Sequence, residues 1–106
     1  MNYPEIYRSK VYEGFKEIEP EAWREIIQFF EENEKRIKKL EFEEYFEVLI
    51  GYINALFEGE KFLKHLEIVD IAIEASINRS VKYHNNRDIF KTLLYQKAVA
   101  SYRTLQ

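Results

Sequence analysis

The chain has 106 residues, a formal net charge of −3, 46% hydrophobic and 33% charged residues, and no cysteine. This composition is too apolar for a disordered chain, and the sequence contains neither a signal-peptide segment nor an apolar run of the ~20 residues that a transmembrane helix needs, so we expect a cytoplasmic location. Disulfides and thiolate metal sites are excluded, and the negative charge argues against nucleic acid as the main partner.

Apolar residues recur at spacings of three and four along the chain, which predicts helices and no sheet. The first predicted helix covers residues 4–18. The second runs from Pro20 to Leu40 as one helix with a single apolar stripe. That stripe consists of Trp23, Ile26, Ile27, Phe30, Ile37 and Leu40.

Three further helices are predicted in the rest of the chain. Residues 42–58 form the third, which Gly59 caps at its C-terminal end. The fourth begins at once and ends near Arg79, with an apolar side made of Phe62, Leu66, Val69, Ala72, Ile73 and Ile77. After the connector "SVKYHNN", the fifth is capped by Asn85 or Asn86 and carries the stripe Phe90, Leu93, Leu94, Ala98, Tyr102 and Leu105.

A shift of 45 residues aligns the third predicted helix with the fifth, so that apolar, small and aromatic positions coincide. The aligned pairs are Leu49 with Leu94, Ile53 with Ala98, Ala55 with Ala100, and Phe57 with Tyr102. A period of this length is typical of helical-repeat proteins.

The stretch from Tyr45 to Glu74 also resembles a tetratricopeptide repeat. In that family the first helix carries a leucine, a small residue and an aromatic, and the second helix has an aromatic near its start and a small residue farther along. The matching residues are Leu49, Ala55 and Phe57, then Gly59 near the turn, and Phe62 and Ala72. His65 stands where the family usually has a small residue. The resemblance covers one full pair and the following first helix, to Gln106.

The fold prediction is therefore all-α, with antiparallel helix pairs stacked as a short right-handed solenoid and an up-and-down helical bundle as the alternative. We expect one domain, 1–106, in three parts. Residues 1–40 form atypical N-terminal capping helices, residues 41–79 form the repeat-like pair, and residues 85–106 form the first helix of a following, incomplete pair.

The resemblance implies a protein–protein interaction scaffold, whose concave groove takes a peptide or a partner helix. The groove-facing candidates are Glu47, Ile50, Asn54, Phe57, Thr92, Tyr95, Val99 and Tyr102. A clamp of the chaperone-binding type is not expected, because that clamp has a basic residue one turn before its asparagine and Ile50 precedes Asn54 here.

The fifth helix has no following helix to cover its apolar side, so we expect it to associate with something outside the 106 residues. The candidate self-association residues are Phe90, Leu94, Ala98 and Leu105. Either the chain belongs to a longer helical-repeat protein, or two copies form a homodimer through this helix.

No catalytic, metal or cofactor site is expected. Neither His65 nor His84 follows a glutamate at a spacing of three, as di-iron helical bundles require, so His65 is interpreted as a packing residue and His84 as a solvated one. The serines lie in no nucleophile elbow, and Glu43 and Glu47 share a solvated helix flank. We therefore expect a protein or peptide partner and no enzyme, nucleic acid or membrane. The alternatives are a sensor domain for a small ligand or signalling peptide, and a small structural dimerising bundle.

Overall fold

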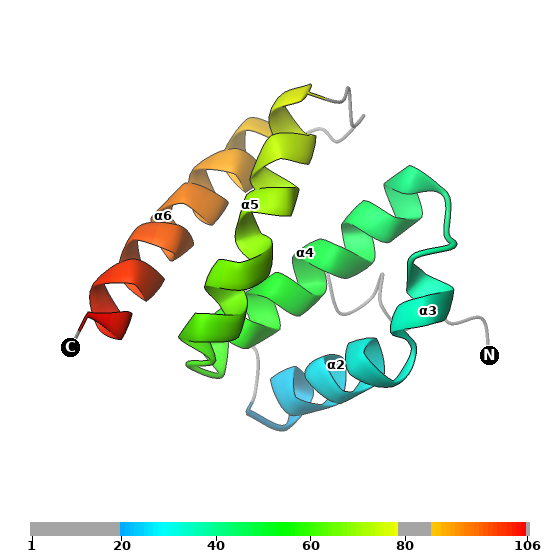
Figure 1. Cartoon of the computed structure of the whole chain (residues 1–106), viewed down its shortest axis with the longest axis horizontal. Coiled ribbons are helices and arrows are strands. Elements are labelled where there is room, and N and C mark those ends of the chain that lie inside the picture. The colour runs from blue at the N-terminus through cyan, green and yellow to red at the C-terminus, as the bar shows by residue number, and fades with distance from the viewer. Residues whose placement is uncertain (1–19, 79–85, 106) are drawn as a thin grey trace. The chain divides into compact units, whose positions relative to one another are not determined.

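The computed structural model describes residues 20–78 and 86–105, and all regular secondary structure in these residues is α-helical (Figure 1). In chain order the helices are α2 (Pro20–Glu32), α3 (Glu34–Ile37), α4 (Phe42–Glu58), α5 (Phe62–Asn78) and α6 (Asn86–Thr104). The prediction of an all-α fold is confirmed for these residues. The predicted helix 4–18 and the connector around His84 lie outside the described residues.

The chain divides into two compact units, Met1–Glu60 and Lys61–Gln106. In the described part of the first unit α2 packs on α4, and in the second α5 packs on α6. Such helix pairs are compatible with a helical-repeat array and with a bundle alike. The repeat-like pair predicted at 41–79 spans the boundary between the units, so it stays a prediction, as does the single domain.

The second predicted helix is interrupted at Asn33, and the prediction of one continuous helix from Pro20 to Leu40 was wrong. The Asn33 side chain donates a hydrogen bond from Nδ2 to the Phe29 carbonyl oxygen (2.9 Å), an oxygen that also accepts from the Asn33 backbone N–H (3.1 Å). Asparagine side chains compete in this way with regular helical bonding. Asn33 leaves the helical conformation at φ −117° and ψ 17°, and the short helix α3 begins after it.

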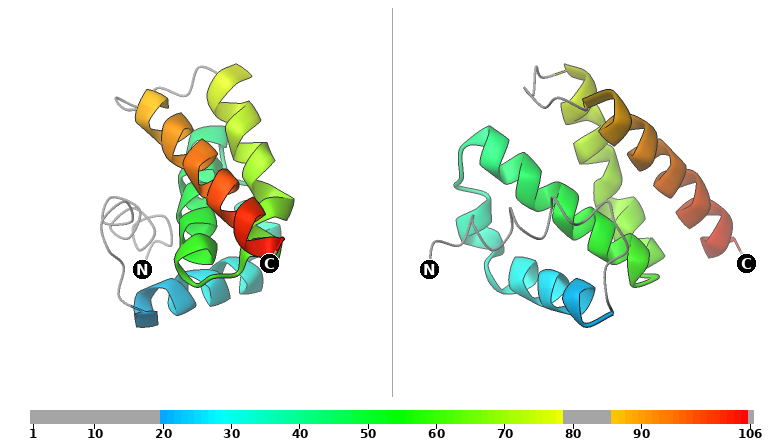
Figure 2. Two further views of the ribbon diagram at one scale, coloured as in Figure 1. Left: turned by 90° about the vertical axis from the view of Figure 1, so that its left-hand side faces the viewer. Right: turned by 180° about the vertical axis from the view of Figure 1, so that it is seen from behind.

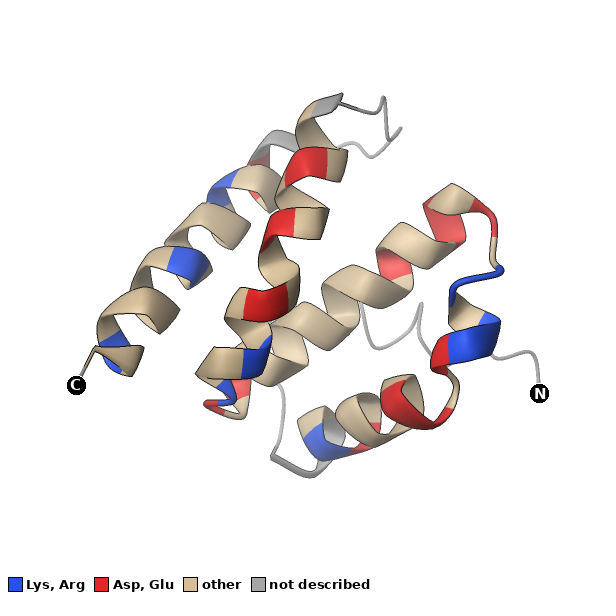
Figure 3. Cartoon of the chain, viewed as in Figure 1, with Lys and Arg blue, Asp and Glu red and all other residues tan. Residues whose placement is uncertain are grey.

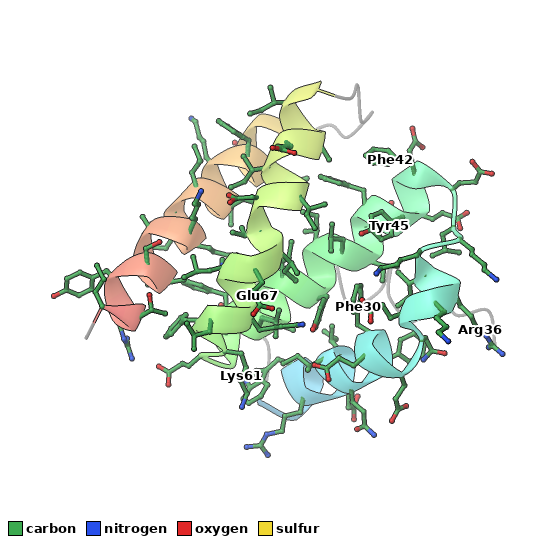
Figure 4. The ribbon with its side chains drawn as sticks, viewed as in Figure 1. Phe30, Arg36, Phe42, Tyr45, Lys61 and Glu67 are labelled. Carbon is green, nitrogen blue, oxygen red and sulfur yellow. The ribbon has the colours of Figure 1, made fainter. Side chains whose placement is uncertain are left out.

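Helices α2 and α4 run antiparallel and are held together by aromatic contacts. The rings of Phe30 and Tyr52 are stacked with their centroids 3.8 Å apart, and Phe30 lies between the two helices in Figure 4. At the other end of the pair, Trp23 lies against Gly59. A stacked aromatic pair adds about 0.5–1.5 kcal/mol beyond the burial of its two rings, so Phe30 and Tyr52 contribute to the stability of the first unit.

Burial along α4 extends around the whole helix. Ten residues from Phe46 to Leu56 are buried, including Val48, Ile50 and Asn54. These three lie outside the wide apolar face that helical spacing predicts, which consists of Phe42, Tyr45, Phe46, Leu49, Ile53, Leu56 and Phe57. A helix that is apolar nearly all round is typical of a core position.

Gly59 occupies the C-cap of α4, as predicted, but its role is steric. Its φ of −81° and ψ of 5° suit any residue, whereas the following Glu60 has the left-handed φ of 58°. A Cβ atom on Gly59 would lie 2.9 Å from Cε3 of Trp23. Glycine therefore lets the α4 backbone approach the indole ring without displacing it.

Gly59→Ala should lower the free energy of unfolding by about 1–3 kcal/mol, because the added methyl group forces the Trp23 ring to move. The measurement is urea unfolding followed by far-ultraviolet circular dichroism, which also reports on variants that lack Trp23, the sole tryptophan. In a Trp23→Leu background the same substitution should have little effect. An equal loss in both backgrounds would mean that the indole is not the cause.

Candidate interaction surface

Helices α5 and α6 lie side by side in all the views of the second unit and run antiparallel (Figures 1 and 2). Their contacts fix the register of the pair. The Arg103 guanidinium, near the end of α6, lies 5.3 Å from the centroid of the Phe62 ring at the start of α5. Farther along, Nζ of Lys97 donates to Oδ1 of Asp70 at 2.7 Å. Both of these charged contacts are partly exposed, so each contributes at most about 1 kcal/mol.

The buried interface of this pair is formed by one stripe on each helix. On α6 the buried residues recur at spacings of four, three and four, and we call them the inner stripe: Ile89, Leu93, Gln96 and Ala100. On α5 the fully buried residues are His65, Val69 and Ala72, also on one helical face. Because His65 contacts Gln96, these two stripes face each other.

A buried hydrogen bond joins the two stripes. Nε2 of His65 lies 3.0 Å from Oε1 of Gln96, and because an amide oxygen only accepts, Nε2 carries the proton and donates. Both side chains are almost fully buried. A buried polar pair among apolar neighbours favours the one register in which its members meet. The prediction that His65 is a packing residue is consistent with this position, but its pairing with Gln96 was not foreseen.

Burial also sets the charge state of His65. Desolvation of the imidazolium form lowers the pKa of His65 below its ordinary value of 6.5, and the hydrogen bond to Gln96 opposes this shift. The neutral ring is therefore the form that the α5–α6 interface favours.

Acidification should destabilise the protein through His65. The unfolded chain binds a proton near pH 6.5 and the folded chain does so only at lower pH, so stability is complete above pH 6.5 and falls below it by at most about 1.4 kcal/mol per pH unit. Urea unfolding at a series of pH values from about 8 to 5, above the range in which most carboxylates titrate, should show this slope. The His65→Gln variant should lack this pH dependence, and the His84→Asn variant should still show it. A slope that survives His65→Gln would assign the effect to another group.

Opposite the inner stripe, α6 carries a second apolar face. The residues of this face are exposed, and the last of them follows the end of α6. We call them the outer stripe: Leu94, Tyr95, Ala98, Tyr102 and Leu105. The four large side chains among them are 42–87% exposed. A helix that packs on one neighbour is normally polar on its far side. The apolar outer stripe is therefore a candidate contact surface.

The outer stripe contains several of the site residues that the sequence predicted. Leu94, Ala98 and Leu105 were predicted as self-association residues, and Tyr95 and Tyr102 as groove residues. The structure places all five on one exposed face. Phe90, Thr92 and Val99 are half-buried. Of the six residues in the apolar stripe predicted for the fifth helix, only Leu93 is buried.

The predicted groove residues of α4 lie in the other unit. Ile50 and Asn54 are buried, and Glu47 and Phe57 are half-buried. The groove as a surface shared between α4 and α6 stays a prediction.

Acidic residues of the second unit lie mostly on α5 and basic residues mostly on α6 (Figure 3), although Lys64 of α5 pairs with Glu67 and Asp88 lies in the first turn of α6. The exposed side of α5 carries Glu67, Asp70 and Glu74 beside the exposed Leu63 and Ile77. Helix α6 carries Lys91, Lys97 and Arg103. Self-pairing of α5 through its outer side would bring like charges together, whereas the outer stripe of α6 contains no charged residue.

Among residues 20–78 and 86–105, no three His, Cys, Asp or Glu side chains are grouped so that they could hold a metal ion. None of the helices described is both long and apolar enough to cross a membrane.

Comparison of the chain with protein-family models, with curated proteins and with solved structures gave no match. The resemblance to tetratricopeptide repeats therefore stays a prediction from the sequence.

Proposed function

We propose that this protein is a helical protein-interaction module and that the outer stripe of α6 is the surface that takes the partner. The observation that carries the proposal is the exposure of that stripe on a helix whose opposite face is already packed on α5. The proposed role is binding, and it assigns no catalytic residue.

The chemistry of the outer stripe favours an amphipathic partner helix. Its residues recur at spacings of three and four, which matches the apolar face of a second helix laid against it. Tyr95 and Tyr102 offer large contact areas at a small entropic penalty, and tyrosine is enriched among the residues that dominate binding energy.

The proposal concerns the second unit alone. The helix pairs would stack as the predicted tetratricopeptide-like solenoid, in which α6 belongs to the surface that meets a peptide or a partner helix. The proposal also holds for a helical bundle that leaves the outer stripe of α6 at its edge.

Photo-crosslinking in cells that express the protein tests the proposal. A photoreactive phenylalanine analogue replaces Tyr102 in one variant and Leu63, on the exposed side of α5, in another. We expect the analogue at position 102 to crosslink to a protein, and Leu94→Glu to lower the yield of this crosslink at least about tenfold. A tenfold loss of affinity corresponds to about 1.4 kcal/mol, and a charge buried in a contact weakens binding by more than that. Crosslinks that are equal at the two positions, or insensitive to Leu94→Glu, would contradict the proposal.

A further inference from the structure

The smallest member of the outer stripe, Ala98, lies between large exposed side chains. Leu94 and Tyr102 lie four residues to either side of it, and Lys91 and Leu105 lie seven residues to either side. All of these residues are exposed. A two-fold axis beside Ala98 would set Leu94 of each copy against Tyr102 of the other, so this part of the stripe can pair with an antiparallel copy of itself.

Resting on the proposed function, we infer that the partner helix is α6 of a second copy of this chain. The two α6 helices cross antiparallel, with the two-fold axis beside Ala98. Ala98 of one copy meets Ala98 of the other, and each Leu94 packs on the Tyr102 ring of the second copy. A small residue at the crossing point lets the axes approach to about 8 Å, the close end of the range for packed helices.

The charge of Lys91 favours an antiparallel pair of α6 helices over a parallel pair. A parallel pair would place Lys91 beside Lys91 of the second copy. In the antiparallel pair Lys91 lies beside Leu105 of the second copy, at the C-terminal end of its helix. Unsatisfied carbonyl groups give that end a partial negative charge, which attracts a cation. The outer side of α5 is less suited to self-pairing, because Glu67 and Glu74 would lie against acidic residues of the second copy.

The size of the stripe sets the expected affinity. Five side chains with these exposures offer on the order of 500 Å² per copy, whereas standard stable interfaces use about 800 Å² per partner. The dimer should therefore be weak, with a dissociation constant of about 1–100 μM. Such a dimer forms as the protein concentration rises and dissociates on dilution.

Two measurements on the full chain test the inference. Sedimentation equilibrium from about 1 μM to 1 mM should show a monomer–dimer transition that Leu94→Glu abolishes and the matched Leu63→Glu preserves. The second measurement is oxidative crosslinking of single-cysteine variants. The chain has no cysteine of its own, so any disulfide must join two copies.

Ala98→Cys should crosslink readily, because two Cα atoms beside the axis lie within the 4.4–6.8 Å that a disulfide spans. Lys91→Cys should not, because the antiparallel arrangement separates the two positions by ~21 Å along the helices, at 1.5 Å per residue. Leu63→Cys, on α5, is the control for random collision.

Each outcome decides the inference. Dimers that crosslink through Ala98→Cys at least about tenfold faster than through Lys91→Cys and Leu63→Cys support it. Comparable rates at Lys91 would mean a parallel pair, and comparable rates at Leu63 would mean another face; either result overturns it. A monomer at every concentration also overturns it. The proposed function would still hold in that case if photo-crosslinks to other proteins depend on Leu94, and it would fail if they do not.

Discussion

Leu93→Glu should unfold the α5–α6 pair, and we expect it to reduce the free energy of unfolding by more than about 4 kcal/mol. Leu93 belongs to the inner stripe and is 1% exposed, so the substitution removes a packed side chain and brings a carboxylate into an apolar interface. The result should be a loss of far-ultraviolet helical signal, or a large shift of the urea midpoint to lower concentration.

The control for this prediction is the next residue in the chain. Leu94 lies in the outer stripe, and Leu94→Glu should change the free energy of unfolding by no more than about 0.5 kcal/mol, measured below the concentrations at which copies associate. Glutamate and leucine have similar helix propensities, so the comparison isolates the face on which the residue lies. Equal losses for the two variants would contradict the assignment of two faces to α6.

Phe30→Ala should have the largest effect in the first unit, a loss of about 3–5 kcal/mol. The Phe30 ring is buried and stacks on Tyr52 with an interplanar angle of 14°, so its removal leaves a cavity between α2 and α4. Unfolding in urea, followed by the fluorescence of Trp23 on the same helix, measures the loss.

Gln28→Ala is the matched control on α2. Gln28 is exposed and its side chain only donates to Glu32 one turn later, so the change should be under about 0.5 kcal/mol. If Phe30→Ala were as mild as Gln28→Ala, the aromatic stack would not be a main support of the α2–α4 pair.

The positions of the helices were largely predictable from the sequence. Strong periodicity and the glycine at residue 59 located α4 and α5 to within a residue or two of the structure. The break at Asn33 was not predicted. Its cause is a side-chain hydrogen bond to the Phe29 carbonyl, and a pattern of apolar spacing carries no information about such a bond.

The two faces of α6 could not be separated from the sequence. Leu93 and Leu94 both fit a helical apolar pattern, and only the packing of α5 shows which of them is buried. A signal was present in Gln96, which falls at the spacing of Ile89, Leu93 and Ala100. A polar residue in such a stripe indicates a buried partner, but the identity of that partner depends on the register of two helices, which one sequence does not encode locally.

The most direct test of the central claim, that α6 is packed on one face and binds on the other, is hydroxyl-radical footprinting of the purified chain at rising concentration. Leu93 should be protected at every concentration, because α5 covers it. Leu94, Tyr95 and Tyr102 should react in dilute protein and become protected as copies associate, while Leu63 should react throughout. If Leu93 reacts as they do, the packing of α6 on α5 is contradicted. If Leu94, Tyr95 and Tyr102 keep the same reactivity at all concentrations, the pairing of the outer stripe with a second copy is contradicted.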